Sequence, residues 1–263
     1  MTSTAQQPAT PSACLAALLA TDPARPRLTS IRPDERLDLS AATVANWVAK
    51  TANLLRNELL VEPGDVVGLA LPRHWLAAVW LLAADAVGVA VSPAGPDARP
   101  VGTGAEVDPH DMVAMLVGPD AAPDVLDAAL GAGVEVLVAS LRPFGLPAEP
   151  PPAAPLRDFA EAARAHGDRF NGPDPDPSLP LLTGPVRPAL TRLEAQRAAV
   201  THAAQAGWDA GSRVLSEGPV TGQSLVRGLL APWSAGGSAV WAGNLEAAQI
   251  VTVLEQERVT DRA

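Results

Sequence analysis

Hydrophobic and polar positions follow one another in blocks that predict an α/β protein. The run 66–71 is apolar on both faces, which is typical of a central parallel strand. A helix over 73–87 follows, because apolar residues recur there at three- and four-residue steps, and it leads into a strand over 87–91. A second strand, helix and strand are expected within 112–139. Alternation of this kind predicts a parallel sheet covered by helices.

Capping and turn residues mark further elements. A hairpin is predicted over 27–39 around a turn at Pro33, and Ser40 is placed to cap the helix that follows. The residues 156–170 are expected to form one helix. Thr191 and Glu194 have the spacing of a capping box, which predicts a helix start. The remaining expected elements are strands at 179–182, 213–216 and 239–241 and helices at 225–233 and 245–258.

Composition along the chain suggests four segments. Residues 1–26 are interpreted as an N-terminal extension with a short helix and a linker. Residues 27–140 contain the hairpin, its helix and a first α/β lobe, and 141–180 form a proline-rich connector. Residues 181–263 form part of a second α/β lobe.

Composition also excludes several classes of protein. The chain has 263 residues, of which 48% are hydrophobic and 18% charged, so it buries a core and is not disordered. Its net charge of −10, without a cluster of basic residues, argues against nucleic-acid binding. The most apolar run, 75–91, is shorter than the roughly 20 residues of a membrane span. Because the N-terminus has no basic start for a secretory signal, we expect a cytoplasmic protein that does not bind membranes.

Side chains that usually carry chemistry are sparse. Lys50 is the single lysine, and its place on the polar face of a helix indicates a solvated residue. The single cysteine, Cys14, is interpreted as a buried or idle thiol. The histidines stand far apart without a ligand spacing, so we expect them to be surface or half-buried and predict no metal site. They are His74, His110, His166 and His202.

Two glycine-containing segments are weak candidates for phosphate loops. The segment 102–104 has no strand immediately before it and is followed by acidic residues that would repel a pyrophosphate. The segment 218–224 has glutamine where a phosphate loop has lysine, and a tight turn before a helix explains it as well.

Read in order, these pieces resemble a known superfamily. The segment 60–69, the helix after Trp75 and the segment 88–93 resemble the start of the adenylate-forming (AMP-binding) superfamily of acyl-CoA synthetases. Thr191 with its helix, and the segments 213–215, 236–240 and 259–260, match later landmarks of that superfamily in order. The segments 140–145, 158–160 and 167–170 resemble a small actinobacterial family related to these enzymes. The resemblance implies parallel-sheet β-α-β layers like the N-terminal part of the adenylate-forming large domain, without the C-terminal domain.

Departures from the superfamily pattern weaken the expected phosphate loop, which falls at 182–189. Thr183 and Gly184 match it, but Pro185 and Pro188 lack N–H donors for phosphate oxygens. The cation that remains is Arg187, which is wider than lysine. By this resemblance the candidate nucleotide-binding residues are Thr183, Gly184, Arg187 and Thr191. Each also has a plain structural interpretation, as a turn, a surface charge or a helix cap.

The resemblance implies that the chain stops about halfway through the superfamily's large domain, before the C-terminal domain whose lysine stabilises charge during adenylation. Lys50 lies in the wrong place to replace that lysine. We therefore expect a truncated pseudoenzyme without catalytic residues that acts as a binding or regulatory module. One alternative is a half-enzyme that completes an adenylate-forming site with another chain. Another is a protein that binds a nucleotide or acyl group without turnover.

Ligands and partners follow from these interpretations. We predict no cofactor, and ATP or AMP with Mg²⁺ only if nucleotide binding is retained. An open sheet edge would favour a protein partner or a homodimer. The proline-rich stretch 141–180 is a second candidate to cover such an edge.

Overall fold

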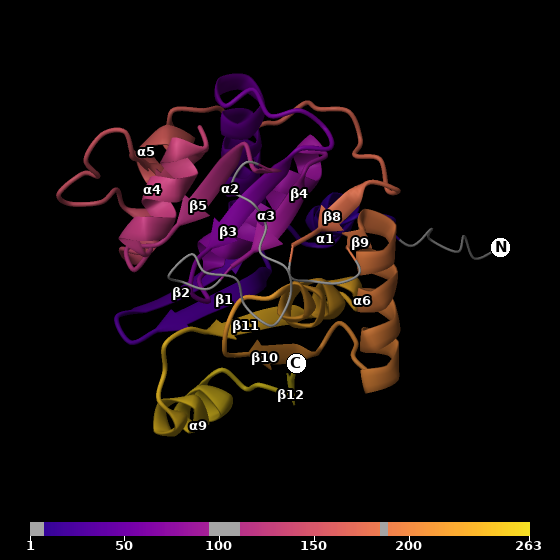
Figure 1. The fold of residues 1–263 in the computed structure, drawn as a ribbon. Coiled ribbons are helices and arrows are strands. Elements are labelled where there is room, and N and C mark those ends of the chain that lie inside the picture. The colour runs from indigo at the N-terminus through magenta and orange to yellow at the C-terminus, as the bar shows by residue number, and fades with distance from the viewer. Residues whose placement is uncertain (1–7, 95–110, 185–188) are drawn as a thin grey trace.

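Two mostly parallel sheets form the frame of the molecule, as the ribbon of Figure 1 shows. The structure is a computed structural model that describes residues 8–94, 111–184 and 189–263. Within those residues the first sheet has five strands in the order β12-β10-β11-β1-β2, and only β2 runs antiparallel to its neighbour. Its strands are β1 (Pro26–Arg32), β2 (Glu35–Ser40), β10 (Arg213–Ser216), β11 (Ser238–Ala242) and β12 (Asp261–Arg262).

The second sheet has seven strands in the order β7-β6-β5-β3-β4-β8-β9, within the same described residues. All neighbours are parallel except β8 and β9. The predicted α/β fold with parallel β-α-β layers is therefore confirmed. The strands are β3 (Val66–Ala70), β4 (Ala90–Pro93), β5 (Ala114–Val117), β6 (Glu135–Val138), β7 (Arg157–Asp158), β8 (Pro180–Leu182) and β9 (Leu190–Thr191).

The sheets do not follow the order of the chain. The N-terminal hairpin β1–β2 pairs with β11, with Leu28 opposite Ala239. In turn β8, from the last third of the chain, joins β4 through Val91 and Leu182. The proline-rich stretch contributes β7 to the edge of the seven-stranded sheet. The division into four segments stays a prediction.

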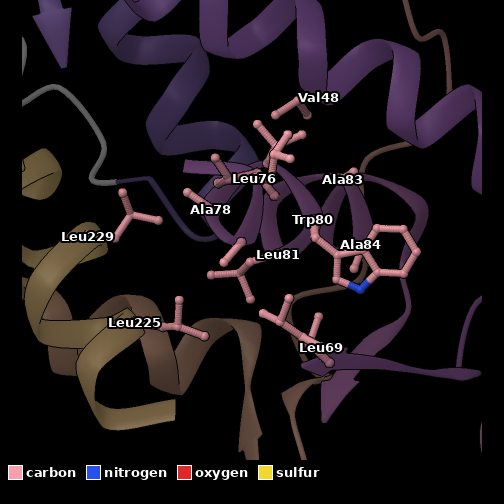
Figure 2. Close-up of a cluster of buried hydrophobic side chains, with 14 of the residues drawn as sticks. Val48, Leu69, Leu76, Ala78, Trp80, Leu81, Ala83, Ala84, Leu225 and Leu229 are labelled. Carbon is pink, nitrogen blue, oxygen red and sulfur yellow. The ribbon is translucent and has the colours of Figure 1, made fainter. Parts of the chain in front are cut away.

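Helix α3 (Trp75–Val87) forms the centre of the core. Every residue except Ala86 is buried, so the helix is enclosed on all sides and not along one stripe as expected. Figure 2 shows Trp80 and Leu81 of α3 with Leu69 of β3 and with Leu225 and Leu229, which lie on helices that follow β10. An apolar helix between the sheets thus supplies the shared core of both.

Further helices cover this core. Ser40 and Thr191 accept the predicted capping hydrogen bonds at the starts of α2 and α6. The helices are α1 (Pro11–Thr21), α2 (Ala41–Asn53), α4 (Pro123–Gly131), α5 (Phe159–Arg164), α6 (Arg192–Ala206), α7 (Gly222–Leu225), α8 (Ala231–Ser234) and α9 (Ala247–Gln256). The π-helical segments η1 (Leu54–Glu58) and η4 (Val226–Leu230) extend α2 and join α7 to α8, and a single turn, η3, spans Pro143–Gly145. Among the described residues, no helix has the length and apolarity that a membrane crossing requires.

The single helix expected over 156–170 is wrong in extent. Only Phe159–Arg164 is helical, and the helix begins late because Arg157 and Asp158 pair with β6 as strand β7. The side chain of Asp158 then accepts a hydrogen bond from the backbone N–H of Glu161 and caps α5 (2.8 Å). A strand pairing far along the chain has therefore overridden the local helical pattern.

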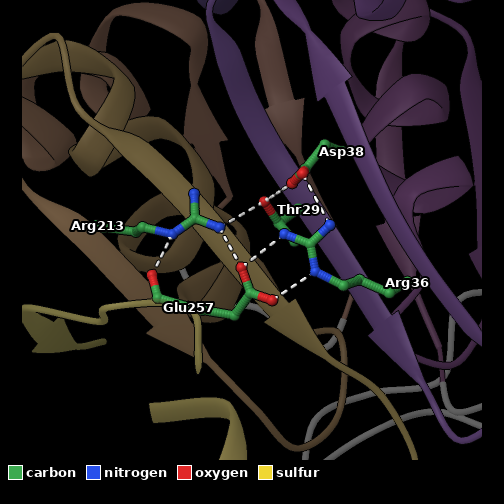
Figure 3. A network of polar contacts seen from close by, with 5 residues as sticks. All are labelled: Thr29, Arg36, Asp38, Arg213 and Glu257. Atoms are coloured by element: carbon green, nitrogen blue, oxygen red, sulfur yellow. Dashed lines mark hydrogen bonds and ion pairs between the residues drawn. The ribbon is translucent and has the colours of Figure 1, made fainter. Parts of the chain in front are cut away.

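A polar cluster attaches the C-terminal region to the hairpin, as Figure 3 shows. The carboxylate of Glu257 accepts hydrogen bonds from Nε and Nη2 of Arg36 (2.6 and 2.9 Å) and from Nη2 of Arg213. Arg213 also donates to Thr29 Oγ1 (2.9 Å), and Thr29 donates to Asp38 (2.6 Å). Although burial alone would raise the pKa of Glu257, the two guanidinium groups hold it below its usual value.

Candidate functional site

The expected phosphate loop begins at the carboxyl end of β8. The backbone N–H of Thr183 donates to the carbonyl of Val91 (3.0 Å), which continues the pairing of β8 with β4. Gly184 follows with a φ of +84°, a left-handed conformation that glycine adopts without strain. Both residues are half-buried. Arg187 lies outside the described residues, as do Pro185 and Pro188.

Thr191 is fully engaged as the cap of α6. Its Oγ1 accepts from the backbone N–H of Glu194 (3.1 Å) and donates to Oε2 of Glu194 (2.9 Å). The same carboxylate accepts from the backbone N–H of Thr191 (2.9 Å), and these hydrogen bonds lower the pKa of Glu194. A phosphate at the start of α6 would meet the carboxylate of Glu194. This carboxylate already accepts a backbone hydrogen bond there and offsets the positive end of the helix dipole. Thr191 therefore lies on β9, which pairs with β8 just before Thr183, but its side chain caps α6.

Arg192, the next residue, is a buried cation that faces the interior. Its guanidinium donates to the carbonyls of Pro180 (2.8 Å), Leu179 (3.2 Å) and Val89 (2.7 Å). Its Nε lies 3.0 Å from Oδ1 of Asp85, and both side chains are fully buried. Burial lowers the pKa of the guanidinium, and Asp85 opposes that shift. This arginine fixes β8 to the strand and helix beside it and is not available to an incoming phosphate.

Asp85 joins this pair to the N-terminal helix. One of its oxygens accepts from the backbone N–H and the hydroxyl of Ser12, at 2.7 and 2.5 Å. Burial raises the pKa of Asp85, while Ser12 and Arg192 act in the opposite direction. Sequence reasoning missed this cluster, although a signal was present. An aspartate inside the most apolar run of the chain needs a buried partner, since an unpaired buried charge is costly.

A crevice lies at the carboxyl ends of β10 and β11, where the connections leave the five-stranded sheet on opposite faces. The helices after β10 pack into the central core through Leu225 and Leu229, whereas α9 after β11 packs with Leu215 and Val240 in a separate cluster. Figure 1 shows α9 on the side of this sheet away from the seven-stranded sheet. Ligands of open α/β sheets bind at such switch points. The crevice has a volume of about 340 Å³ and is lined by Pro72, Arg73, Glu217, Gly218, Pro219, Ala242, Asn244, Leu245 and Ile250.

Arg73 supports the wall of this crevice. The residue is 2% exposed, and its guanidinium donates to the carbonyls of Glu217 (3.1 Å), Gly218 (3.1 Å) and Pro219 (2.9 Å). Its Cζ lies 5.2 Å from the centroid of the Trp241 ring, a cation–π distance. Burial lowers the pKa of Arg73 to about 10. The segment 218–224 is thus a turn whose first two carbonyls accept hydrogen bonds from Arg73. Thr221 caps α7, and the segment is not a phosphate loop.

The histidines and the lysine are structural wherever the structure describes them. His74 is fully buried, against expectation. Its Nδ1 accepts from Leu76 N–H (3.2 Å), its Nε2 lies 3.5 Å from Glu35, and burial lowers its pKa. Lys50 is half-buried, and its Nζ donates to the carbonyl of His166 (2.7 Å). His202 packs edge-on against Trp208, and His110 lies outside the described residues. Over the described part of the chain, no group of three metal-ligating side chains comes together.

Cys14 is buried, as expected for an idle thiol. Burial raises its pKa to about 11, so the thiol stays protonated at neutral pH. The segment 102–104, the other weak phosphate-loop candidate, lies outside the described residues.

Comparison with known proteins supports the fold described above. No family model matches the chain. A solved structure, the anthranilate CoA ligase AuaEII in complex with anthranoyl-AMP, matches with a TM-score of 0.75 and 14% identity over 98% of this chain. The chain spans 50% of that ligase chain, so it has the fold of about half of an adenylate-forming enzyme.

A relative in sequence comes from Mycobacterium tuberculosis (strain ATCC 25618 / H37Rv) and is described as a TIGR03089 family protein. It is 37% identical over 257 residues, which cover 94% of this chain and 95% of the relative. This agrees with the resemblance to a small actinobacterial family. The chain therefore belongs to the TIGR03089 family.

Proposed function

We propose that this chain is a non-catalytic binding or regulatory module built on the fold of an adenylate-forming enzyme. The observation that carries the proposal is that the protein itself uses the polar side chains that directly follow the expected phosphate loop. Thr191 is bound by Glu194, and Arg192 is buried against Asp85 and three carbonyls. A cytoplasmic location stays a prediction.

The electrostatics of adenylation support this proposal. The reaction needs positioned cations that offset triphosphate charge while a carboxylate attacks, and losing such groups costs several kcal/mol of barrier. Lys50, the single lysine, is tied to His166 on the proline-rich stretch. Of the loop's own cations only Arg187 remains, between two prolines that lack N–H donors. The candidate site therefore carries less positive charge than the chemistry demands.

Exchange of labelled pyrophosphate into ATP tests the proposal. The purified chain is incubated with Mg²⁺, ATP and a panel of aliphatic and aromatic carboxylic acids, with the anthranilate CoA ligase as the positive control. We expect exchange by the ligase and none by this chain. Exchange that depends on a carboxylic acid would refute the non-catalytic assignment.

Nucleotide binding without turnover is one form of this function. The ligase of similar fold is described as a complex with anthranoyl-AMP, and here Thr183 and Gly184 lie at the carboxyl end of β8. Calorimetry with ATP and AMP, each with and without Mg²⁺, and with CoA measures it directly. Heat that disappears in the Arg187→Ala variant would assign the nucleotide to this loop. Absence of heat with every ligand would remove nucleotide and CoA binding and leave the regulatory role.

A second candidate function is half of a composite enzyme. The match to 98% of this chain but 50% of the ligase chain favours it, because the chain supplies the fold of about half of such an enzyme. The test is co-expression with a neighbouring reading frame that encodes the other half, followed by the same exchange assay. Activity of the pair, absent from each part, would establish this function, and inactivity of the pair would remove it.

A further inference from the structure

A rigid turn displays a large apolar side chain to solvent. In the single turn Pro143–Gly145, Phe144 is 66% exposed, and the following Leu146 is 40% exposed. Phe144 has a φ of +59° and Gly145 a φ of +61°. The left-handed conformation is costly for a bulky residue and persists only where surrounding groups impose it.

Contacts with three neighbouring residues impose this conformation. The backbone N–H of Phe144 donates to Oε1 of Glu35 (2.7 Å), a carboxylate that is itself 8% exposed. The carbonyl of Phe144 accepts from Nη2 of Arg164 on α5 (3.2 Å). Gly145 lies against the Trp75 ring, where a Cβ would come within 3.0 Å of a ring carbon. The backbone that carries the exposed phenyl ring is therefore fixed before any partner arrives, which lowers the entropic cost of binding.

A groove with complementary character lies on the other side of α5. Its volume is about 370 Å³, and it combines apolar side chains with carboxylates. Glu58 in this groove is bound to Arg157 and His166. The carboxylate of Glu161 is exposed and has no ion pair with any described residue. The lining side chains that matter here are Pro152, Leu156, Ala162, Glu58, Arg157 and Glu161.

We propose that Phe144 docks into this groove of a second copy of the chain, so that two copies form a symmetric dimer. Phe144 and the groove both lie beside α5. In a dimer with two-fold symmetry, each copy can therefore place its Phe144 in the groove of the other copy. Arg164 beside Phe144 then faces the free Glu161 of the second copy, and this charge pairing selects a second copy as the occupant. A small contact of this kind predicts a weak, concentration-dependent dimer.

Sedimentation velocity over a range of protein concentrations tests the proposal. Wild type is expected to shift from monomer to dimer as concentration rises. Phe144→Asn removes the apolar ring but keeps a residue that tolerates the left-handed conformation. We expect it to weaken the dimer by roughly tenfold or more, as for an aromatic residue at the centre of an interface. Val251→Asn is the matched control, since Val251 is an exposed apolar residue (58%) on α9.

Charge reversal provides a second test, aimed at the ion pair between Arg164 and Glu161 of the second copy. Arg164→Glu and Glu161→Arg are each expected to weaken the dimer, and the double variant is expected to restore it. The thermal melting temperature of each variant checks that it is folded. A wild-type chain that stays monomeric, a dimer insensitive to Phe144→Asn, or equal weakening by Val251→Asn would overturn the proposal. A double variant that weakens the dimer further would overturn it as well.

Discussion

At the scale of single residues, the chain uses its buried charges to hold segments together. Arg192 at the start of α6 and Asp85 on α3 are both fully buried, and Nε of Arg192 lies 3.0 Å from Oδ1 of Asp85. Ser12 adds α1 to the same cluster. An unpaired buried charge costs far more than an exposed one, so each member depends on the others.

Asp85→Asn tests this dependence. The variant keeps an acceptor for Ser12 but removes the charge opposite Arg192, so we expect the free energy of unfolding to fall by about 3 kcal/mol. Chemical denaturation followed by tryptophan fluorescence measures it. Asp127→Asn, on the exposed face of α4, is the control and should change stability by less than about 0.5 kcal/mol. Equal effects of the two substitutions would contradict the assigned role of Asp85.

Gly243 shows a close approach that only glycine allows. A Cβ there would lie 2.1 Å from the carbonyl oxygen of Arg73, a backbone atom that cannot move aside cheaply. We expect Gly243→Ala to lower the thermal melting temperature and to destabilise the chain by about 1–3 kcal/mol. Gly167→Ala is the matched control, because a Cβ at Gly167 meets no atom within 4 Å. An unchanged melting temperature in Gly243→Ala would show that the crevice wall is not as close as described.

At the scale of elements, local signals predict helix caps, and pairings between distant strands can override a local helical pattern. Ser40 and Thr191 cap α2 and α6 as their sequences predict. The expected helix over 156–170 is shortened because β7 forms with β6, a pairing that no local pattern encodes. The two-residue strands β9 and β12 are invisible in the sequence for the same reason.

Substitutions of Thr191 distinguish a role as helix cap from a role in ligand binding. If Thr191 is the cap of α6, Thr191→Ala should lower the free energy of unfolding by about 1 kcal/mol, and Thr191→Ser should preserve it. Neither variant should change any heat measured with ATP or AMP. Loss of nucleotide heat with unchanged stability would make Thr191 a ligand residue instead.

The attachment of the C-terminal region to the hairpin predicts a dependence on pH. The pKa of Glu257 is lower in the folded chain than its usual value near 4.5, so the unfolded chain binds the proton more readily. The stabilisation by Glu257 is complete at pH values above the usual pKa of a glutamate. It is lost as the pH falls through the lower pKa that Glu257 has in the folded chain. Glu257→Gln should destabilise the chain by about 1–3 kcal/mol at pH 7 and by less at pH 3. Denaturation midpoints of wild type and variant at both pH values measure this difference. The same difference between wild type and variant at pH 7 and at pH 3 would contradict the prediction.

At the scale of the whole molecule, the sequence predicts the fold better than the site. The hydrophobic periods of the elements around Leu69, Trp75 and Val91 indicate an α/β fold, and the order of these segments resembles the adenylate-forming superfamily. The site depends on side-chain partners that come from distant segments. Arg192 turning inward to Asp85, and Arg73 holding the loop 217–219, could not be derived from local pattern. A partner at a sheet edge stays a prediction, with β2, β7, β9 and β12 as the edges within the described residues.

Single-turnover formation of an acyl-adenylate tests the central claim most directly. The chain is mixed in excess over labelled ATP with Mg²⁺ and the carboxylic acid panel, and the products are separated after acid quench. This measurement detects one round of chemistry even where the product never leaves the protein. We predict that labelled ATP remains intact at the level of the protein-free control. Labelled acyl-adenylate, or AMP formed only when an acid is present, would contradict the account.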